Sequence, residues 1–173
     1  GPVLEKIWLQ HYPAGVPAEI NPSEYRSLVE LIEQAIAMHR DRPCFTCMDR
    51  TLTYGDLDVL ATRFAAYLQQ IARLRKGDRI ALMLPNVLQY PVAILGAFRA
   101  GLTIVNTNPM YTPRELQHQL HDSGARAILI LENFAHTLAE VQHDVRLDTV
   151  IVTGVGDLLA FPKSLLVNFV LRH

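Results

Sequence analysis

Segments typical of strands alternate with segments of helical periodicity from residue 79 to residue 153, and this alternation constrains the fold more than any other feature. The run RIALML at 79–84 is mostly apolar, as in a strand buried on both faces of a parallel sheet. Parallel strands need long crossover connections, which are right-handed. The pattern therefore predicts an α/β fold, with a mostly parallel sheet covered by helices on both faces.

Caps, turn residues and hydrophobic spacing give the expected limits of the elements. Asn21-Pro22-Ser23-Glu24 has the pattern of a helix start, and Asp41-Arg42-Pro43 should close that helix. Its buried face is expected to contain Leu28, Leu31, Ile32, Ala35, Ile36 and His39. A second helix is expected to begin after its cap Thr53, a third to end at Arg99 before Gly101, a fourth to span 113–123, and a fifth to begin near Asn133. Strands are expected at 44–48, 51–54, 79–84, 102–105, 126–131 and 149–153. Asp49-Arg50 is the expected hairpin turn between the first two strands.

The second helix should bury an apolar stripe that contains Leu57, Leu60, Ala61, Phe64, Ala65 and Leu68. The longest uncharged stretch, 80–98, has nearly the length of a membrane span. Pro85-Asn86 and Pro91 interrupt it with turn chemistry that a single helix tolerates poorly. We therefore predict a strand, a turn and a buried helix in this stretch.

Length and composition indicate one globular domain. The chain has 173 residues, of which 50% are hydrophobic and 19% are charged. Its net charge of -1 argues against broad electrostatic capture of nucleic acid, so no nucleic-acid partner is predicted. Two cysteines fit a reducing compartment, and the polar N-terminal region does not resemble a signal peptide. A cytoplasmic location is expected.

Two patterns that could carry metal or redox chemistry are both incomplete. Cys44-Phe45-Thr46-Cys47 matches C-x-x-C, but it lies in a predicted strand, where residues at odd spacing point to opposite faces. Buried structural thiols are favoured. His118 and His121 share a helix face with Glu115, and no further ligand is evident. We predict a solvated helix face and no metal site.

No phosphate-binding loop and no nucleophile elbow is found in the sequence. Gly154-Val155-Gly156 follows a strand, but Leu159 occupies the third glycine position of a dinucleotide-binding turn. No pair of isolated carboxylates stands out for acid–base chemistry. We therefore predict no catalytic and no cofactor-binding residue in this segment.

The corner NTNPMYTPREL at 106–116 follows a predicted strand and opens a helix. Thr112 can cap that helix, Pro113 suits its first position, and Glu115 can bond back to the cap amide. Such loops also hold ligands. The residues alone favour a structural corner and leave a ligand loop as the alternative.

Several motifs together resemble the adenylate-forming enzymes, the superfamily of acyl-CoA synthetases, luciferases and peptide-synthetase adenylation domains. LTYGDL at 52–57 resembles their LTYxEL signature, and the block 77–116, which contains FRAGLTIVNTNPMYTPREL, resembles their next motif. The likeness runs through nearly the whole chain and is greatest to bacterial long-chain fatty acyl-CoA synthetases. The motif residues, interpreted as structural, are Leu52, Thr53, Tyr54, Gly55, Arg99, Gly101, Asn106, Asn108, Pro109, Tyr111 and Glu115.

The resemblance implies a parent enzyme that joins a long-chain fatty acid to coenzyme A. ATP and the fatty acid would give an acyl-adenylate and pyrophosphate with Mg²⁺, and coenzyme A would then displace AMP. The family's phosphate-binding loop and its catalytic lysine have no counterpart in this sequence. The chain is therefore expected to be an N-terminal fragment that binds no cofactor and is inactive by itself. The alternative is a non-catalytic lipid-binding or interaction module of the same fold.

An apolar helix face is the candidate acyl-binding wall for the fatty acid, although core packing explains it as well. Its residues are Pro91, Ile94, Leu95 and Phe98. The expected organisation is an expression-tag scar at 1–2, an N-terminal α/β subdomain of the AMP-binding domain at 3–160, and a truncated apolar tail helix at 161–173. The tail has basic ends, so peripheral contact with the inner membrane is one expectation. Self-association through the tail or through exposed sheet edges is the other.

Overall fold

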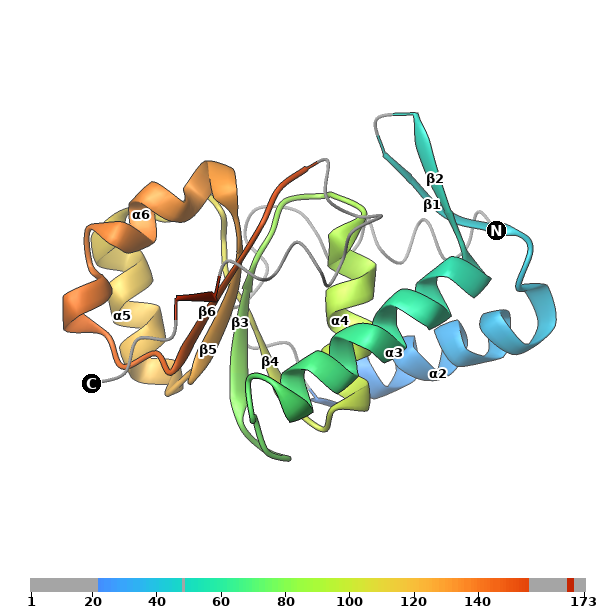
Figure 1. Cartoon of the computed structure of the whole chain (residues 1–173), viewed down its shortest axis with the longest axis horizontal. Coiled ribbons are helices and arrows are strands. Elements are labelled where there is room, and N and C mark those ends of the chain that lie inside the picture. The colour runs from blue at the N-terminus through green and yellow to red at the C-terminus, as the bar shows by residue number, and fades with distance from the viewer. Residues whose placement is uncertain (1–21, 48, 156–167, 170–173) are drawn as a thin grey trace.

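Alternate residues of the central strands point to two different helix layers, and Figure 1 shows these layers on either side of the sheet. The structure is a computed structural model that describes residues 22–47, 49–155 and 168–169. In β3 (Arg79–Met83), Ile80 and Leu82 belong to one core, whereas Ala81 and Met83 belong to the other. Because both of its faces are covered, β3 is apolar along most of its length.

In the described part of the chain, the main sheet has five strands in the order β4-β3-β5-β6-β7. Four of them are parallel, namely β3, β4 (Thr103–Asn106), β5 (Ala127–Leu131) and β6 (Thr149–Thr153). The strand β7 (Asn168–Phe169) pairs with β6 in the antiparallel direction. The predicted α/β fold with a mostly parallel sheet is confirmed.

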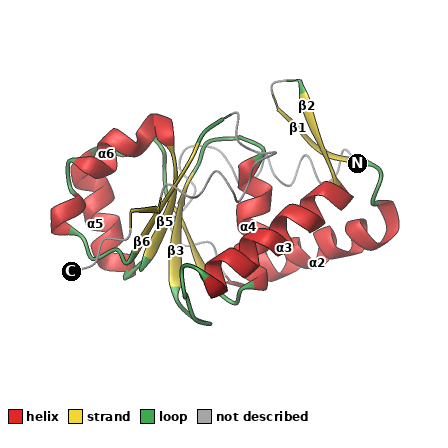
Figure 2. Ribbon diagram, in the orientation of Figure 1, coloured by secondary structure: helices red, strands yellow, loops and turns green. Residues whose placement is uncertain are grey.

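Among the described residues, one face of the sheet is covered by α2 (Pro22–His39), α3 (Tyr54–Gln70) and α4 (Gln89–Arg99), as Figure 2 shows. The apolar stripe predicted for α3 is buried at every position. At Gly96 of α4, an added Cβ would lie 2.8 Å from Cδ1 of Phe64 and 3.0 Å from the carbonyl oxygen of Ala61. Glycine at this position therefore allows α3 and α4 to approach closely.

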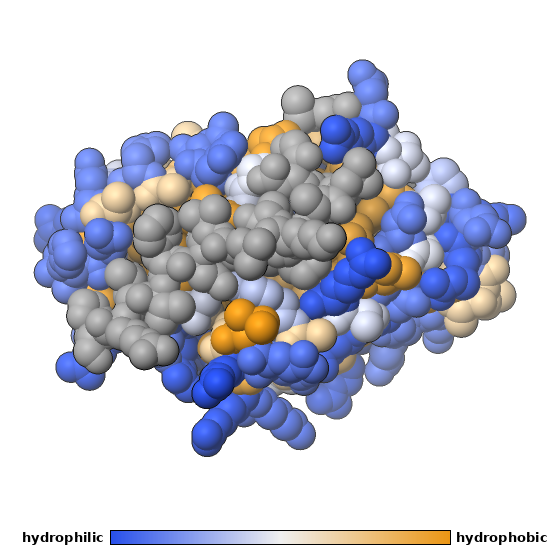
Figure 3. All heavy atoms as spheres, in the orientation of Figure 1, coloured by the Kyte–Doolittle hydropathy of each residue, from blue (hydrophilic) through white to orange (hydrophobic). Residues whose placement is uncertain are grey.

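The opposite face is covered by α5 (Pro113–Ser123) and by α6 (Ala135–Ala139), with the short 3₁₀ turns η1 (Glu132–Phe134) and η2 (Gln142–Asp144) beside α6. Leu116 and Leu120 of α5 join a core that includes Ile128 and Ile130 of β5. The outer sides of both helix layers are hydrophilic in the view of Figure 3. Each helix thus follows the usual division into an apolar inner face and a polar outer face.

A separate two-stranded antiparallel sheet is formed by β1 (Pro43–Cys47) and β2 (Arg50–Thr53). In Figure 1 this hairpin projects beyond the start of α3. The predicted turn at Asp49-Arg50 is wrong at Arg50, which belongs to β2 and pairs with Cys47. Asp49 has a positive φ of 64°. An aspartate tolerates this left-handed conformation, so the reversal is completed one residue earlier than expected.

The buried face predicted for α2 is wrong at two positions. Leu31 is 44% exposed, and His39 is only half-buried. Neighbouring helical residues are about 100° apart, so Leu31 lies to one side of the buried residue Ile32. The inner face is instead completed by Tyr25 and Val29.

The predicted tail helix at 161–173 is contradicted at Asn168–Phe169, which form the strand β7. Pairing with β6 accounts for this difference, because the edge of β6 offers backbone partners that a helix would not use. The rest of the tail, the tag scar at 1–2 and the cap Asn21 lie outside the described residues. Within the described part of the chain no helix is long and apolar enough to cross a membrane, and 80–98 divides into strand, loop and helix as predicted.

Candidate functional site at the carboxyl ends of the parallel strands

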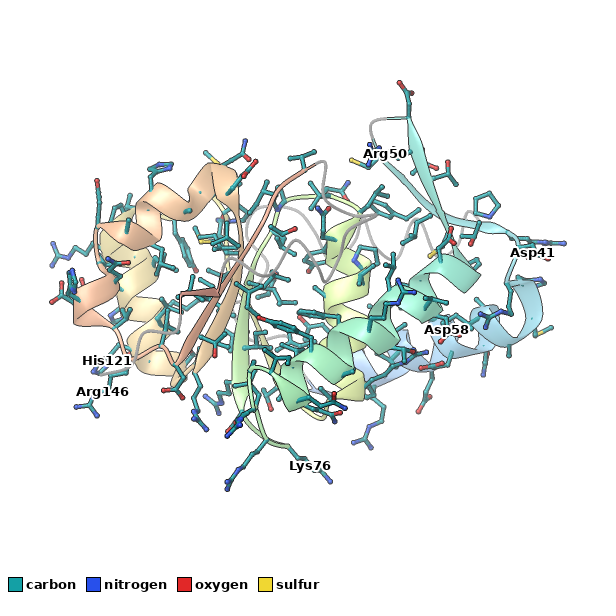
Figure 4. The ribbon with its side chains drawn as sticks, in the orientation of Figure 1. Asp41, Arg50, Asp58, Lys76, His121 and Arg146 are labelled. Carbon is teal, nitrogen blue, oxygen red and sulfur yellow. The ribbon has the colours of Figure 1, made fainter. Side chains whose placement is uncertain are left out.

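Open α/β sheets bind ligands outside the carboxyl ends of their strands. In this chain the loops that follow β3, β4 and β6 are joined at that end by side-chain hydrogen bonds. Figure 4 places Arg50, in the hairpin, near this end of the molecule and Lys76 at the opposite end. The carboxyl end is therefore the first place to look for a site.

Gln89, the first residue of α4, connects the loop after β3 to the end of β6. Its side chain is buried, and Nε2 donates to the carbonyl oxygen of Gly154 at 2.6 Å and to Oγ1 of Thr153 at 3.4 Å. Its Oε1 atom is buried without a hydrogen-bond partner among the described residues. A neutral amide, and not a charge, thus holds these two loops together.

Asn106, the last residue of β4, is held from two helices. Tyr90 of α4 donates its hydroxyl proton to Oδ1 of Asn106 at 3.3 Å. Nε2 of Gln119 in α5 donates to the carbonyl oxygen of Asn106 at 3.0 Å, while Oε1 of Gln119 is buried without a partner in the described part of the chain. These contacts fix the point at which the chain leaves the sheet.

The corner after Asn106 has the capping box that the sequence predicts. The N–H of Glu115 donates to Oγ1 of Thr112 at 3.2 Å, and the N–H of Thr112 donates to Oε1 of Glu115 at 3.1 Å. The backbone hydrogen bond from Thr112 is the main reason why the pKa of Glu115 lies below its ordinary value, and the side-chain hydrogen bond of Thr112 acts in the same direction. The N–H of Met110 donates to Oδ1 of Asn108 at 2.9 Å. Local bonds thus support the corner from Asn108 to Glu115.

The motif LTYGDL joins the hairpin to α3. Leu52 is 2% exposed and Tyr54 is 1% exposed, whereas Thr53 caps the helix through a reciprocal bond with Asp56, each at 3.0 Å. The N–H of Gly55 donates to the carbonyl oxygen of Arg40 at 2.8 Å, and an added Cβ would lie 3.2 Å from that oxygen. Each of these residues has a packing or hydrogen-bonding role in the described structure.

Arg99 connects all three helices of its layer. Its Nε and Nη2 atoms donate to the two carboxylate oxygens of Glu33 in α2, each at 3.0 Å, and its Nη1 lies 2.9 Å from Oδ1 of Asp58 in α3. Asp58, labelled in Figure 4, also accepts from Arg40 at 2.8 Å. Burial by itself would lower the pKa of Arg99, but its bonds to Glu33 and Asp58 outweigh burial and raise it. The hydrogen bond from Arg40 holds the pKa of Asp58 below its ordinary value.

Gly101 lies at the other end of β4, just before the strand begins. Its φ is +77°, which a residue with a side chain rarely adopts. Its carbonyl oxygen accepts from the N–H of Gly77 at 2.9 Å, which joins two turns at the amino end of the sheet. The motif residues are therefore distributed over both ends of the sheet and a helix layer, and they do not converge on one site.

The four acyl-wall candidates all lie on α4. Pro91, Ile94 and Leu95 are buried, and Phe98 is half-buried against the same core. Their packing in the first helix layer accounts for their apolar character. An acyl-binding role for them stays a prediction.

The thiols lie in β1, and the two histidines of the predicted solvated face lie on the exposed side of α5. Burial raises the pKa of Cys44 to about 12, and Cys47 is half-buried; both are free. His118 and His121 are 78% and 81% exposed at the side chain and lie beside Asp122. Among the described residues, no group of three or more His, Cys, Asp and Glu side chains could hold a metal ion.

Described residues line surface hollows near these elements. The first, which we name the α5 groove, has a volume of about 560 Å³ and is lined by Val105, Tyr111, Arg114, Glu115, His118, Gln119, Asp122 and Ser123. The second has a volume of about 470 Å³ and lies between β2 and α3, where Arg50, Leu52, Val59 and Arg63 line it together with Leu88. Ser123 and His118 both line the first hollow, but Ser123 Oγ donates to the carbonyl oxygen of Leu120 and accepts from the N–H of Ala125, and both of these partners are backbone groups and not a base.

Sequence reasoning missed Gln89, Tyr90 and Gln119, which organise the carboxyl end. The sequence predicts only turn chemistry at Gln89 and Tyr90, in a stretch that is otherwise apolar. The available signal was their position beside a strand end, whereas Gln119 follows Leu116 at helical spacing on the buried side of α5. Such residues must find partners when they are buried, but the sequence does not say which partners.

Comparison with known proteins agrees with this fold. The AMP-binding enzyme family matches residues 32–169, so the chain belongs to that family. Among curated relatives, a long-chain-fatty-acid–CoA ligase of Escherichia coli O157:H7 is 54% identical over 170 residues, and one of Bacillus subtilis strain 168 is 34% identical over 162 residues. These matches cover 98% and 94% of this chain, but only 30% and 29% of the relatives. The chain thus spans about a third of the length of the ligases that it resembles.

Solved structures show the same architecture. A long-chain-fatty-acid-CoA ligase from Archaeoglobus fulgidus matches with a TM-score of 0.65 and 23% identity, over 82% of this chain and 30% of that one. An anthranilate CoA ligase in complex with anthranoyl-AMP matches with a TM-score of 0.68 and 18% identity, over 79% of this chain and 25% of that one. These two likenesses establish the fold, in which the described segment corresponds to part of a larger ligase.

Proposed function

We propose that this chain is the N-terminal part of an ATP-dependent ligase that activates long-chain fatty acids as acyl-adenylates and transfers them to coenzyme A. The observation that carries the proposal is the 54% identity to a long-chain-fatty-acid–CoA ligase over 98% of the chain. The matched range includes loops as well as core strands, and loops are where function differs among members of a fold. The fold alone would not support this choice of substrate.

The parent enzyme would use ATP, Mg²⁺ and coenzyme A, and we propose that their ligands come from outside this segment. The sequence has no glycine-rich phosphate loop, and the described part of the chain has no cluster of metal ligands. We therefore assign no catalytic step to these residues. Their contribution is to place the loops at the carboxyl end of the sheet, through Gln89, Tyr90 and Gln119.

The isolated chain should be inactive because those phosphate and metal ligands are missing from it. We expect no fatty-acid-dependent release of pyrophosphate from ATP by the pure 173-residue chain. Fatty-acid binding, measured in parallel by calorimetry, distinguishes the alternative function of a lipid-binding module. Tight stoichiometric binding without any adenylation would favour that module over the ligase segment.

A chimera provides the positive test. Residues 3–173 would replace the matching N-terminal segment of the Escherichia coli O157:H7 relative, and the relative itself would serve as the control. We expect the chimera to form acyl-CoA in the presence of ATP, Mg²⁺, coenzyme A and a long-chain fatty acid. A chimera that folds cooperatively, as judged by thermal unfolding, and yet forms no acyl-CoA would contradict the proposal.

We further propose that the parent acts in the cytoplasm with peripheral contact to the inner membrane, where its apolar substrate partitions. The apolar tail with its basic ends motivates this proposal, because such segments bind anionic lipid surfaces. Co-sedimentation with vesicles that contain anionic lipid tests it. Equal amounts of chain in the pellet with and without vesicles would reject membrane contact for this segment.

A further inference from the structure

We propose that Gln89 and Tyr90, the first two residues of α4, position the loops after β4 and β6 for the ligase reaction of the parent enzyme. We name this pair the α4 clamp. The inference rests on the proposed function, because it concerns the rate of that reaction. Three features support it: the reach of the two side chains across the sheet, the place of α4 in the chain topology, and the directional nature of the contacts.

The two side chains of the α4 clamp contact strands on opposite sides of β3. The hydroxyl of Tyr90 donates to Oδ1 of Asn106, the last residue of β4, at 3.3 Å. Nε2 of Gln89 donates to the carbonyl oxygen of Gly154, directly after β6, at 2.6 Å. In the strand order β4-β3-β5-β6, these contacts reach both ends of the parallel row, which is about 14 Å wide. Two adjacent residues thus fix two loops that are far apart in the sequence.

The chain topology places the α4 clamp where connections change from one face of the sheet to the other. The loop after β3 leads to α4 on one face, whereas the loops after β4 and β5 lead to α5 and α6 on the opposite face. Open α/β sheets bind ligands outside the carboxyl ends of their strands at such a point. The loop that follows β3 leads directly into the clamp. A shift of the clamp would therefore move the loops around the position that this topology favours for a ligand.

The contacts of the α4 clamp are directional and buried. Gln89 and Tyr90 are 1% and 2% exposed, and the helix that follows them, from Pro91 to Ala97, is apolar and buried. A hydrogen bond forms only within a narrow range of distance and angle, so each contact holds its loop in one place. Reaction rates depend steeply on such placement, since a shift of about 1 Å can lower a rate by about a hundredfold. Both contacts join described residues, so they do not depend on what covers the surface of the segment.

The chimera with the Escherichia coli O157:H7 relative tests the clamp, and the unmodified chimera is the reference. Without coenzyme A the reaction stops at the acyl-adenylate, so pyrophosphate is released in a burst. The amplitude of the burst counts the competent enzyme, and its rate constant reports adenylate formation. This measurement separates the two roles, because a merely structural role would lower the amplitude and leave the rate constant unchanged.

Two substitutions release one loop each. Gln89→Met removes the donor to Gly154 and keeps an unbranched side chain of similar length, and we expect the burst rate constant to fall by about tenfold. Tyr90→Phe removes only the hydroxyl, whose contact with Asn106 is longer, and we expect a fall of about threefold. Gln69→Met and Tyr67→Phe make the same changes in the last turn of α3, which leads toward the amino end of β3. These matched controls should leave the rate constant unchanged.

The outcomes distinguish the α4 clamp from the function on which it rests. An unmodified chimera that forms no adenylate would contradict the proposed function, and the clamp with it. An active chimera whose rate constant either variant leaves unchanged would overturn the clamp alone, and so would a fall in amplitude at an unchanged rate constant. If Gln89→Met gives no burst at all, Tyr90→Phe decides, since it keeps the buried ring and removes only the hydroxyl.

Discussion

At the amino ends of the parallel strands, Arg126 lies between Asp78 and Asp148, whereas at the carboxyl ends Gln89 and Gln119 make the connecting contacts. Arg126 contacts Asp78 at 3.2 Å and also pairs with Asp148, and about half of the side-chain surface of Arg126 and Asp148 is exposed. The two glutamines are 1% and 8% exposed. The side-chain contacts at one end of the sheet thus include exposed ion pairs, whereas those at the other end are made by buried neutral amides.

This difference between the two ends indicates which contacts contribute most to the stability of the fold. Exposed ion pairs contribute little, because water and salt screen them and long side chains must be ordered to form them. A buried amide contributes more, since its loss leaves a backbone carbonyl without a donor. We therefore expect the carboxyl end of the sheet to be the more sensitive to single substitutions.

The largest effect on stability should come from Gln89→Glu. This change removes the donor to Gly154 and places a carboxylate in a buried position, so we expect the free energy of unfolding to fall by about 3 kcal/mol at pH 7. Denaturant unfolding followed by circular dichroism measures it. Gln69→Glu, on the exposed end of α3, is the matched control and should change stability by less than about 0.5 kcal/mol. Equal effects of the two substitutions would remove the basis of the comparison.

A smaller loss of stability is expected for Gln119→Leu. The variant leaves the carbonyl oxygen of Asn106 without the amide of Gln119, but it also eliminates the buried Oε1 atom that has no partner. These consequences oppose each other, so the free energy of unfolding should fall by only about 1 kcal/mol. Gln117→Leu, on the half-buried side of α5, provides the control. A stability gain in Gln119→Leu would show that the orphan oxygen outweighs the bond.

At the amino end, Arg126→Gln should lower the free energy of unfolding by about 0.5 kcal/mol, because roughly half of the arginine side chain is exposed and its ion pairs are screened. The cost should shrink further at high salt, whereas the cost of Gln89→Glu should hardly change, since buried groups are screened much less. Unfolding of both variants at low and high salt tests this pair of expectations. A cost at Arg126 that is large and independent of salt would reverse the contrast between the two ends.

The smallest effect should be a change in pH dependence at Glu115. The pKa of Glu115 in the folded chain lies below its ordinary value, so its contribution is present above the unfolded pKa, near 4.5, and is lost as pH falls through the folded pKa. Glu115→Gln should therefore differ from the unmodified chain at neutral pH and converge with it in acid. Thermal unfolding over this pH range provides the measurement. Parallel curves would show that the capping carboxylate does not titrate as the geometry implies.

Local patterns in the sequence predicted most of the fold. The helix at 113–123 and the strand at 149–153 have the predicted limits, and both the Thr53 and the Thr112 caps are present. The predictions were wrong where tertiary contacts determine the burial or the pairing of a residue. Leu31 faces solvent, Arg50 belongs to the strand β2, and Asn168–Phe169 pair with β6. The candidate site was predicted less well, because its organising residues are single amides with no periodic pattern.

The sequence by itself determined the order and type of the elements, the parallel sheet, the helix caps and the family. Periodicity, capping and turn chemistry act over a few residues, so a linear sequence records them directly. Only the tertiary structure decided which distant residues meet. Gln89 contacts Gly154 across 65 positions, and Arg99 contacts Glu33 across 66. Those contacts follow from the strand order and from the packing of the helices, which no short-range pattern contains.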